Sequence, residues 1–261
     1  MNLQTADRHS GAASASQGAA IKRFHVLFVL TVCLSAVAAA AQTIYFLRDY
    51  DESLYLYHYG ATPYVFYGIC AAVLALLFFS FLVIPSEEAP MTLAKPGRMI
   101  NFTALLCGFF LAASILLYAI YALSGIETDM STLHLAAILT ALPASLYFFI
   151  TAFSAQPSRK TLILFGFFVV IWAILFLLYI YFDMSIPLTS PMRPMNYLSL
   201  FMIMSYFLLE LRFLLQAEKP RIYLSVSLMS IFALSFTCIP DFIMTCIGRR
   251  NSNSIFHIAQ L

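Results

Sequence analysis

Residues 162–182 read LILFGFFVVIWAILFLLYIYF and contain no charged side chain. An α-helix rises about 1.5 Å per residue, so a stretch of about 20 apolar residues can cross the roughly 30 Å hydrocarbon core of a bilayer. Arg159 and Lys160 come shortly before this stretch, as is common at the cytoplasmic end of a span. The stretch therefore predicts a transmembrane helix.

Six further stretches of similar length and apolarity lie on either side of this one. They are residues 24–47, 63–84, 102–123, 133–153, 195–216 and 223–247. In the whole chain 62% of residues are hydrophobic and 10% are charged, whereas soluble domains have roughly 45–50% and 25%. A membrane β-barrel would show segments of about ten alternating residues, which these uninterrupted runs do not resemble. We therefore expect an all-α, polytopic transmembrane helical bundle with seven spans.

The positions of lysine and arginine indicate the orientation of the bundle. Short cytoplasmic loops retain these residues. With the amino terminus inside, most of the 14 lysines and arginines fall on the cytoplasmic side, namely Arg8, Lys22, Arg23, Lys95, Arg98, Arg159, Lys160, Arg212, Lys219 and Arg221. Acidic residues gather on the opposite side and make the outer loops negative. We expect the amino terminus inside and the carboxyl terminus outside.

The chain divides into a central transmembrane domain and two short ends. Residues 1–23 are rich in Ala, Ser, Gly and Gln, which favours a flexible cytoplasmic tail. Residues 24–248 form the expected seven-helix domain. Residues 249–261 are too few to span a membrane, so we expect an interfacial segment or the stub of a further span.

The first span also resembles a signal peptide. Lys22 and Arg23 precede its apolar run, and the alanines at 38–41 could form a cleavage site. However, the apolar run continues to Leu47 and exceeds the usual 7–15 residues of a signal peptide. An uncleaved helix is the favoured interpretation.

Small residues are expected where helices meet, because lipid tails give helices no hydrophobic reason to associate and close packing must do so. Ala104, Gly108 and Ala112 lie four residues apart in the third stretch. Ala137, Ala141 and Ser145 have the same spacing in the fourth. These faces are predicted to contact other helices.

Glu210 is the strongest candidate for a functional residue within a span. An ionisable side chain at mid-helix costs about 2.5–3.5 kcal/mol on insertion scales, so such residues usually have a role. Tyr206, four residues earlier, shares the same helix face. One interpretation is a proton or cation relay. The other is a structural carboxylate, hydrogen-bonded to a neighbouring helix or paired with Lys219 or Arg221.

Asp241 and Arg193 form a second candidate pair, near the expected outer surface. Asp241 lies late in the last span, and Arg193 stands in the proline-rich segment 187–194. Their pairing would connect two spans at the outer face. Alternatively, these residues contact a cation or a substrate.

Tyrosines are concentrated on the expected outer side. Tyr55 and Tyr57 lie in the first outer loop, and Tyr64 begins the next span. One explanation is an aromatic belt, since an amphipathic ring suits the headgroup region. Tyrosines beside acidic loops would also suit a vestibule that attracts cations or other ligands.

Several kinds of chemistry are not expected. The four lysines (Lys22, Lys95, Lys160 and Lys219) lie in loops or tails, so no buried amine is available for a retinal-type Schiff base. H-E-x-x-H, G-x-S-x-G and phosphate-binding glycine patterns are absent, and the five cysteines form no C-x-x-C. We therefore expect no enzymatic activity, no cofactor, no metal site and no nucleic-acid partner.

Three functions remain. We place a small-solute transporter or permease subunit first, with Glu210 and Asp241 beside its path. The second is a ligand sensor whose tyrosine-rich outer face acts through a partner. The third is a non-catalytic accessory or assembly subunit of a membrane complex. The expected partners are the lipid bilayer and another membrane protein or a second copy of this chain. The compact loops favour a bacterial cytoplasmic membrane.

Overall fold

The computed structural model describes residues 3–51, 56–57, 62–82, 97–123, 132–154, 158–182, 192–215 and 220–247. Within them the chain forms the helices α1 (Leu3–Asp49), α2 (Thr62–Phe79), α3 (Arg98–Leu123), α4 (Thr132–Phe153), α5 (Arg159–Phe182), α6 (Met192–Leu214) and α7 (Pro220–Cys246). A 3-10 helix, η1 (Ser80–Leu82), continues α2, and the two-residue strands β1 (Tyr50–Asp51) and β2 (Leu56–Tyr57) pair antiparallel. Apart from that pair, the described fold is all-helical, as predicted.

Six helices are long and apolar enough to cross a membrane. They are α1 from Arg23 onward, α3, α4, α5, α6 and α7. The second predicted span, residues 63–84, is matched only in part, because the apolar helix ends at Phe79 and the tighter turn of η1 follows. Length and apolarity therefore agree with a multi-pass membrane protein.

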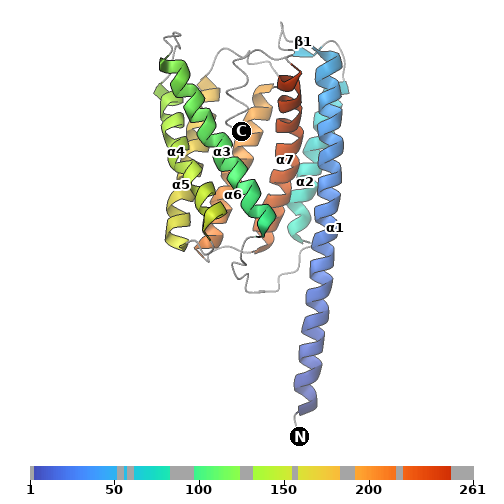
Figure 1. Cartoon of the computed structure of the whole chain (residues 1–261). Helices are drawn as coiled ribbons and strands as arrows, with labels where there is room; N and C mark the ends of the chain where they lie inside the picture. The colour runs from blue at the N-terminus through green and yellow to red at the C-terminus, as the bar shows by residue number, and fades with distance from the viewer. Residues whose placement is uncertain are drawn as a thin grey trace.

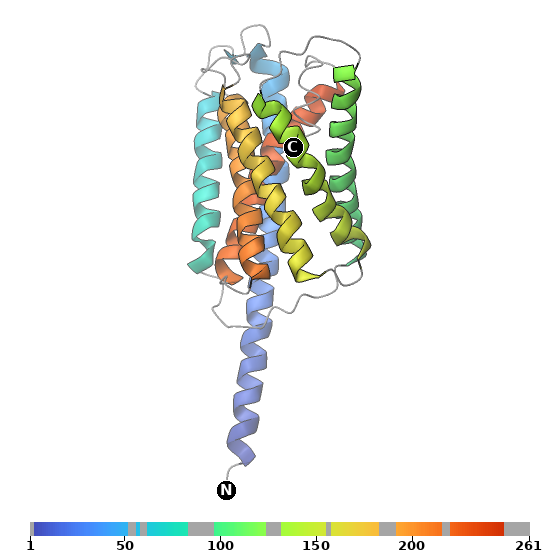
Figure 2. The same cartoon turned by 90° about the vertical axis from the view of Figure 1, so that its left-hand side faces the viewer.

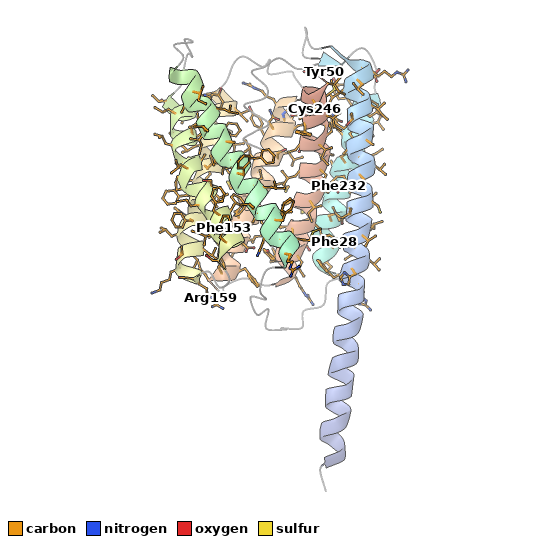
Figure 3. The ribbon with its side chains drawn as sticks, viewed as in Figure 1. Phe28, Tyr50, Phe153, Arg159, Phe232 and Cys246 are labelled. Atoms are coloured by element: carbon orange, nitrogen blue, oxygen red, sulfur yellow. The ribbon has the colours of Figure 1, made fainter. Side chains whose placement is uncertain are left out.

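The helices form a bundle in which neighbours in sequence pack side by side from α3 to α7 (Figures 1 and 2). Both α1 and α2 pack against α7. Tyr50 and Arg159 lie at opposite ends of the bundle (Figure 3), which we call the β1 end and the Arg159 end. At the Arg159 end α1 extends beyond the bundle toward the amino terminus (Figure 1), so the segment expected to be a tail is helical from Leu3.

Large apolar side chains cover the outside of the bundle (Figure 3). Leu76 of α2, Phe109 of α3 and Leu139 of α4 are each more than half exposed. Exposed apolar surface costs roughly 25 cal/mol per Å² in water, and contiguous patches of it are rare on soluble monomers. This exterior therefore suits contact with lipid tails.

Small residues bring α3, α4 and their neighbours close together, as predicted. Ala137, Ala141 and Ser145 of α4 are buried. At Gly108 of α3, an added Cβ would lie 3.2 Å from the Cβ of Phe148. The absence of a side chain at residue 108 therefore allows α3 to pack directly on α4.

Candidate functional site

Glu210 lies where α6 meets α7, toward the Arg159 end. Its Oε2 accepts a hydrogen bond from the Tyr223 hydroxyl of α7, with a distance of 2.5 Å between the oxygens. The hydroxyl oxygens of Tyr223 and Tyr206 lie 3.3 Å apart, and either can donate. Tyr206 and Glu210 occupy successive turns of α6. These three residues form a hydrogen-bonded connection between the two helices, which we call the Glu210 chain.

Aromatic rings surround the Glu210 chain. Phe213 stacks on Tyr223 with ring centroids 5.3 Å apart. Phe207 meets Tyr206 edge-on, also at 5.3 Å. The Glu210 side chain is half-buried among them. Its carboxyl group therefore has one phenol hydroxyl, that of Tyr223, as its described hydrogen-bond partner and otherwise lies in largely apolar surroundings.

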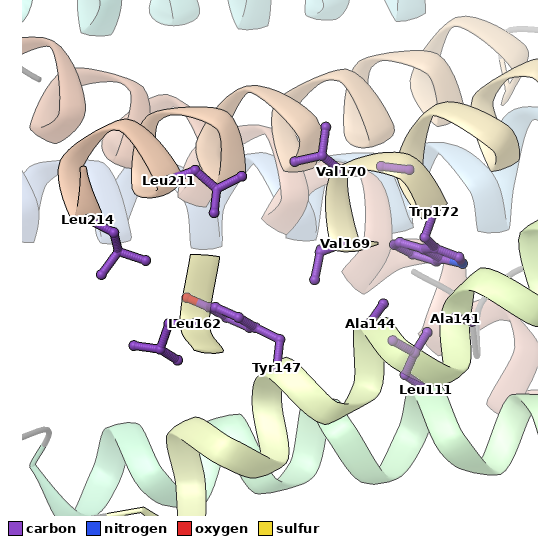
Figure 4. Close-up of a cluster of buried hydrophobic side chains, with 11 residues drawn as sticks. Leu111, Ala141, Ala144, Tyr147, Leu162, Val169, Val170, Trp172, Leu211 and Leu214 are labelled. Carbon is purple, nitrogen blue, oxygen red and sulfur yellow. The ribbon is translucent and has the colours of Figure 1, made fainter. Parts of the chain in front are cut away.

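Tyr147 of α4 extends this aromatic region. Its ring packs edge-on against Phe207 at 5.5 Å, and the residue is close enough to interact electrostatically with Glu210. Figure 4 shows Tyr147 reaching from α4 toward Leu211 of α6. Gly166 of α5 makes this packing possible, because an added Cβ there would lie 2.9 Å from Cδ2 of Leu211 and 3.3 Å from the Tyr147 ring. Three helices thus hold the surroundings of Glu210 in place.

No lysine or arginine among the described residues forms an ion pair with Glu210. The Nε atom of Arg221 is buried and has no hydrogen-bond partner within that part of the chain. Arg212 is exposed, and Lys219 lies outside the described residues. Of the two structural interpretations, the structure contains the hydrogen bond to a neighbouring helix and not the pair with Arg221.

Arg193 and Asp241 are both buried at the β1 end of the α6–α7 contact, with 2% and 7% of their surface exposed. Ser199 of α6 donates a 2.6 Å hydrogen bond to Thr237 of α7 and so fixes the register of these antiparallel helices. At 1.5 Å per residue, Arg193 lies about 9 Å and Asp241 about 6 Å beyond that bond, in the same direction. The two charged residues therefore lie at similar heights on adjacent helices.

Gln42 and Asn196 lie at the same end and were missed by the sequence analysis. Gln42 of α1 is fully buried, and its Nε2 donates a 3.0 Å hydrogen bond to the Tyr67 hydroxyl of α2. The same nitrogen lies 3.8 Å from the sulfur of Met195. Asn196 of α6 is also buried. We refer to Gln42, Arg193, Asn196, Ser199, Thr237 and Asp241 as the β1-end cluster.

An apolar layer separates the β1-end cluster from the Glu210 chain. Ser199 and Tyr206 are seven residues apart on α6, which corresponds to about 10 Å. Between them Met202 packs against Leu228, Phe232 and Phe236 of α7, all buried. The α6–α7 contact is therefore polar near each end and mainly apolar in the middle, where the buried Ser230 hydroxyl donates a 3.4 Å hydrogen bond to the carbonyl oxygen of Met202.

Of Tyr55, Tyr57 and Tyr64, the structure describes the side chain of Tyr64. Tyr64 is 69% exposed on α2. The backbone of Tyr57 pairs with Tyr50 in the β1–β2 ladder. Tyr55 lies outside the described residues. The exposure of Tyr64 suits an aromatic belt better than an interior pocket.

The polar residues of the Glu210 chain and the β1-end cluster are suited to hydrogen bonding and to charge interactions more than to metal coordination. Within the described ranges, no three His, Cys, Asp or Glu side chains lie close enough together to hold a metal ion. His134 instead stacks on Tyr179, with ring centroids 4.3 Å apart.

The chain matches no protein-family model, no curated protein and no solved structure. Its function must therefore be argued from the α6–α7 contact itself.

Proposed function

We propose that this chain is a small-solute transporter, or the permease subunit of one. The observation that carries this proposal is the α6–α7 contact, where the buried β1-end cluster and the half-buried Glu210 chain lie toward opposite ends of a mainly apolar layer. Ionisable residues within spans commonly mark solute and ion pathways. Many transporters bind their solute between helices that close one side of the path at a time. The apolar layer around Met202 would be the closed part of such a path.

The β1-end cluster supports a small polar solute. Arg193 can donate to an anionic group, and Asp241 can accept from an amine or hydroxyl. Gln42 and Asn196 add amide groups that both donate and accept. A solute carrying both a donor and an acceptor group suits this set. The proposed activity moves that solute without changing it chemically.

Seven spans fit this proposal. The 18 residues of α2 extend about 27 Å, and the three residues of η1 add about 6 Å. Together they match the roughly 30 Å hydrocarbon thickness, although α2 alone is shorter than the other helices.

The proposed orientation places the Arg159 end inside the cell, with the amino terminus. Arg98, Arg159, Lys160, Arg212 and Arg221 lie at or near helix ends on that side, and Arg23 begins the apolar part of α1. Arg48 and Arg193 lie at the β1 end. This asymmetry favours a cytoplasmic Arg159 end, and the bacterial cytoplasmic membrane is the proposed location.

Thiol accessibility tests transport without knowledge of the solute. A transporter must expose its α6–α7 contact to water at some stage, and single cysteines in an otherwise cysteine-free protein report this exposure. We expect Ser199→Cys and Met202→Cys in membrane vesicles to react with a hydrophilic thiol reagent. Leu76→Cys is the control, because an exposed α2 position facing lipid should not react. If neither contact position reacts from either side of the membrane, the proposal is wrong.

A further inference from the structure

The Glu210 chain places a carboxyl group at a helix contact, and no ion pair joins this group to a lysine or arginine among the described residues. An ionised carboxylate taken out of water is unfavourable unless a cation or several donors compensate its charge. Here the described donor to Glu210 is one phenol, Tyr223. A cation that binds from solution would compensate the remaining negative charge of the carboxylate.

We propose that Glu210 is a proton-binding site and that Tyr223 and Tyr206 transmit its protonation along the α6–α7 contact. This inference rests on the proposed transport function and makes the proton its coupling ion. Glu210 lies four residues before the end of α6 at Leu214, or about 6 Å from it, and is half-buried. A proton therefore reaches it from water at the Arg159 end.

The hydrogen bonds of the Glu210 chain can run in two directions, which differ in which oxygen donates. When Glu210 is ionised, Tyr223 donates to its carboxylate and Tyr206 can donate to Tyr223. When Glu210 takes one proton from water, the new carboxyl O–H donates to the Tyr223 oxygen. Tyr223 then turns its own O–H toward Tyr206, which becomes the acceptor. Release of that proton to water restores the first direction, so only the carboxyl O–H bond forms and breaks.

The reversal of these hydrogen bonds connects the protonation of Glu210 to the apolar layer around Met202. Tyr206 lies four residues from Met202 on α6, and Tyr223 lies five residues from Leu228 on α7. Both Met202 and Leu228 are buried where the helices meet. A change in the strength or direction of the Tyr206–Tyr223 bond therefore acts directly beside the proposed closed part of the path.

The groups around Glu210 favour a proton over a metal cation. Tyr223 of α7 bonds to Glu210, and Tyr206 of α6 bonds to Tyr223. Tyr147 of α4 packs against Phe207, and Arg221 is in the first turn of α7. Phenols ordinarily lose their proton only at about pH 10, whereas carboxylic acids lose theirs at about pH 4, so Glu210 is the member of this group that binds and releases the proton. Metal ions such as Ca²⁺ need six to eight oxygen ligands, which one carboxylate with phenol hydroxyls does not provide.

Infrared difference spectroscopy of the purified full chain in lipid nanodiscs tests the site. Between alkaline and acidic pH, wild-type protein should gain a carboxylic-acid carbonyl band that Glu210→Gln lacks. The chain has 12 Asp and Glu residues in all, so the difference between the two proteins isolates Glu210. Asp49→Asn is the matched control and should keep the band, because Asp49 pairs with Arg48 at the opposite end. Glu210→Asp should keep a band at a changed frequency.

Tyr223→Phe tests the transmission step. It removes the hydroxyl bonded to Glu210 and should shift the frequency of the Glu210 band, whereas Tyr64→Phe should leave it unchanged. Identical spectra for wild-type and Glu210→Gln protein overturn proton binding, and an unshifted band in Tyr223→Phe overturns transmission. Thiol accessibility at Ser199 and Met202 is independent of these spectra. A titrating Glu210 with unreactive contact positions would therefore reject transport alone, and the reverse pattern would reject the proton site alone.

Discussion

Glu210 and Tyr223 lie 13 residues apart in the sequence and are joined by a 2.5 Å hydrogen bond between α6 and α7. Glu210 is near the last turn of α6, and Tyr223 is in the first turn of α7. The bond therefore joins α6 and α7 close to where α6 ends and α7 begins, at the Arg159 end. Its acceptor, Glu210, carries the one carboxyl group of α6.

Removal of this bond should destabilise the hairpin. Hydrogen bonds between membrane helices average about 0.6 kcal/mol and reach about 1.7 kcal/mol, and we expect Tyr223→Phe to cost about 1–2 kcal/mol because its acceptor is a carboxyl group. Denaturant unfolding in detergent, followed by the fluorescence of the single tryptophan, Trp172, measures the change. Tyr64→Phe should leave the unfolding free energy unchanged. Equal stability of both variants would contradict a stabilising role for the bond.

The sequence alone indicated two of the three residues of the Glu210 chain, Glu210 and Tyr206. It placed Tyr206 on the same face as Glu210, because residues four apart on one helix are neighbours. Tyr223 belongs to another helix, and no pattern within one helix specifies which side chain of the next will face it. For the same reason, the sequence does not indicate a role for Gln42, because its hydrogen bond to Tyr67 depends on how α1 and α2 pack.

The extent of the helices was more predictable, since apolar length alone sets it. The exceptions are the first part of α1, which is helical from Leu3 where a flexible tail is predicted, and the end of α2. Its apolar sequence continues to Ile84, yet the α-helix gives way to η1 at Ser80. The Ser80 hydroxyl lies 3.1 Å from that of Ser225 on α7. This contact between distant residues coincides with the change of helix type and could not be read from the local sequence.

Gly166→Ala should destabilise the packing around Tyr147. The new Cβ would lie 2.9 Å from Leu211 Cδ2 and 3.3 Å from the Tyr147 ring, so at least one of these side chains must move. Overpacking of this kind typically costs about 1–3 kcal/mol. Gly68→Ala is the matched control, since an added Cβ there meets nothing within 4 Å. The midpoint of thermal unfolding should fall for Gly166→Ala and stay the same or rise for Gly68→Ala.

Arg193 and Asp241 should show energetic coupling. Both are buried at similar heights on α6 and α7, and removal of one member of a buried charge pair costs about 3–5 kcal/mol. We expect Arg193→Gln and Asp241→Asn each to lower the unfolding free energy, and the double variant to lose less than the sum of the two. Strict additivity in this double-mutant cycle would show that the two charges act separately.

Labelling of one residue at each end of the bundle should reveal its orientation in the membrane. Asp49 marks the β1 end and Arg159 the opposite end. In a cysteine-free background, a membrane-impermeant maleimide added to intact cells should label Asp49→Cys. Arg159→Cys should be labelled only after the membrane is permeabilised, because basic helix ends are retained on the cytoplasmic side. The opposite pattern would reverse the orientation and place Glu210 near the outer surface. Protons would then reach the Glu210 chain from outside, and the β1-end cluster would face the cytoplasm.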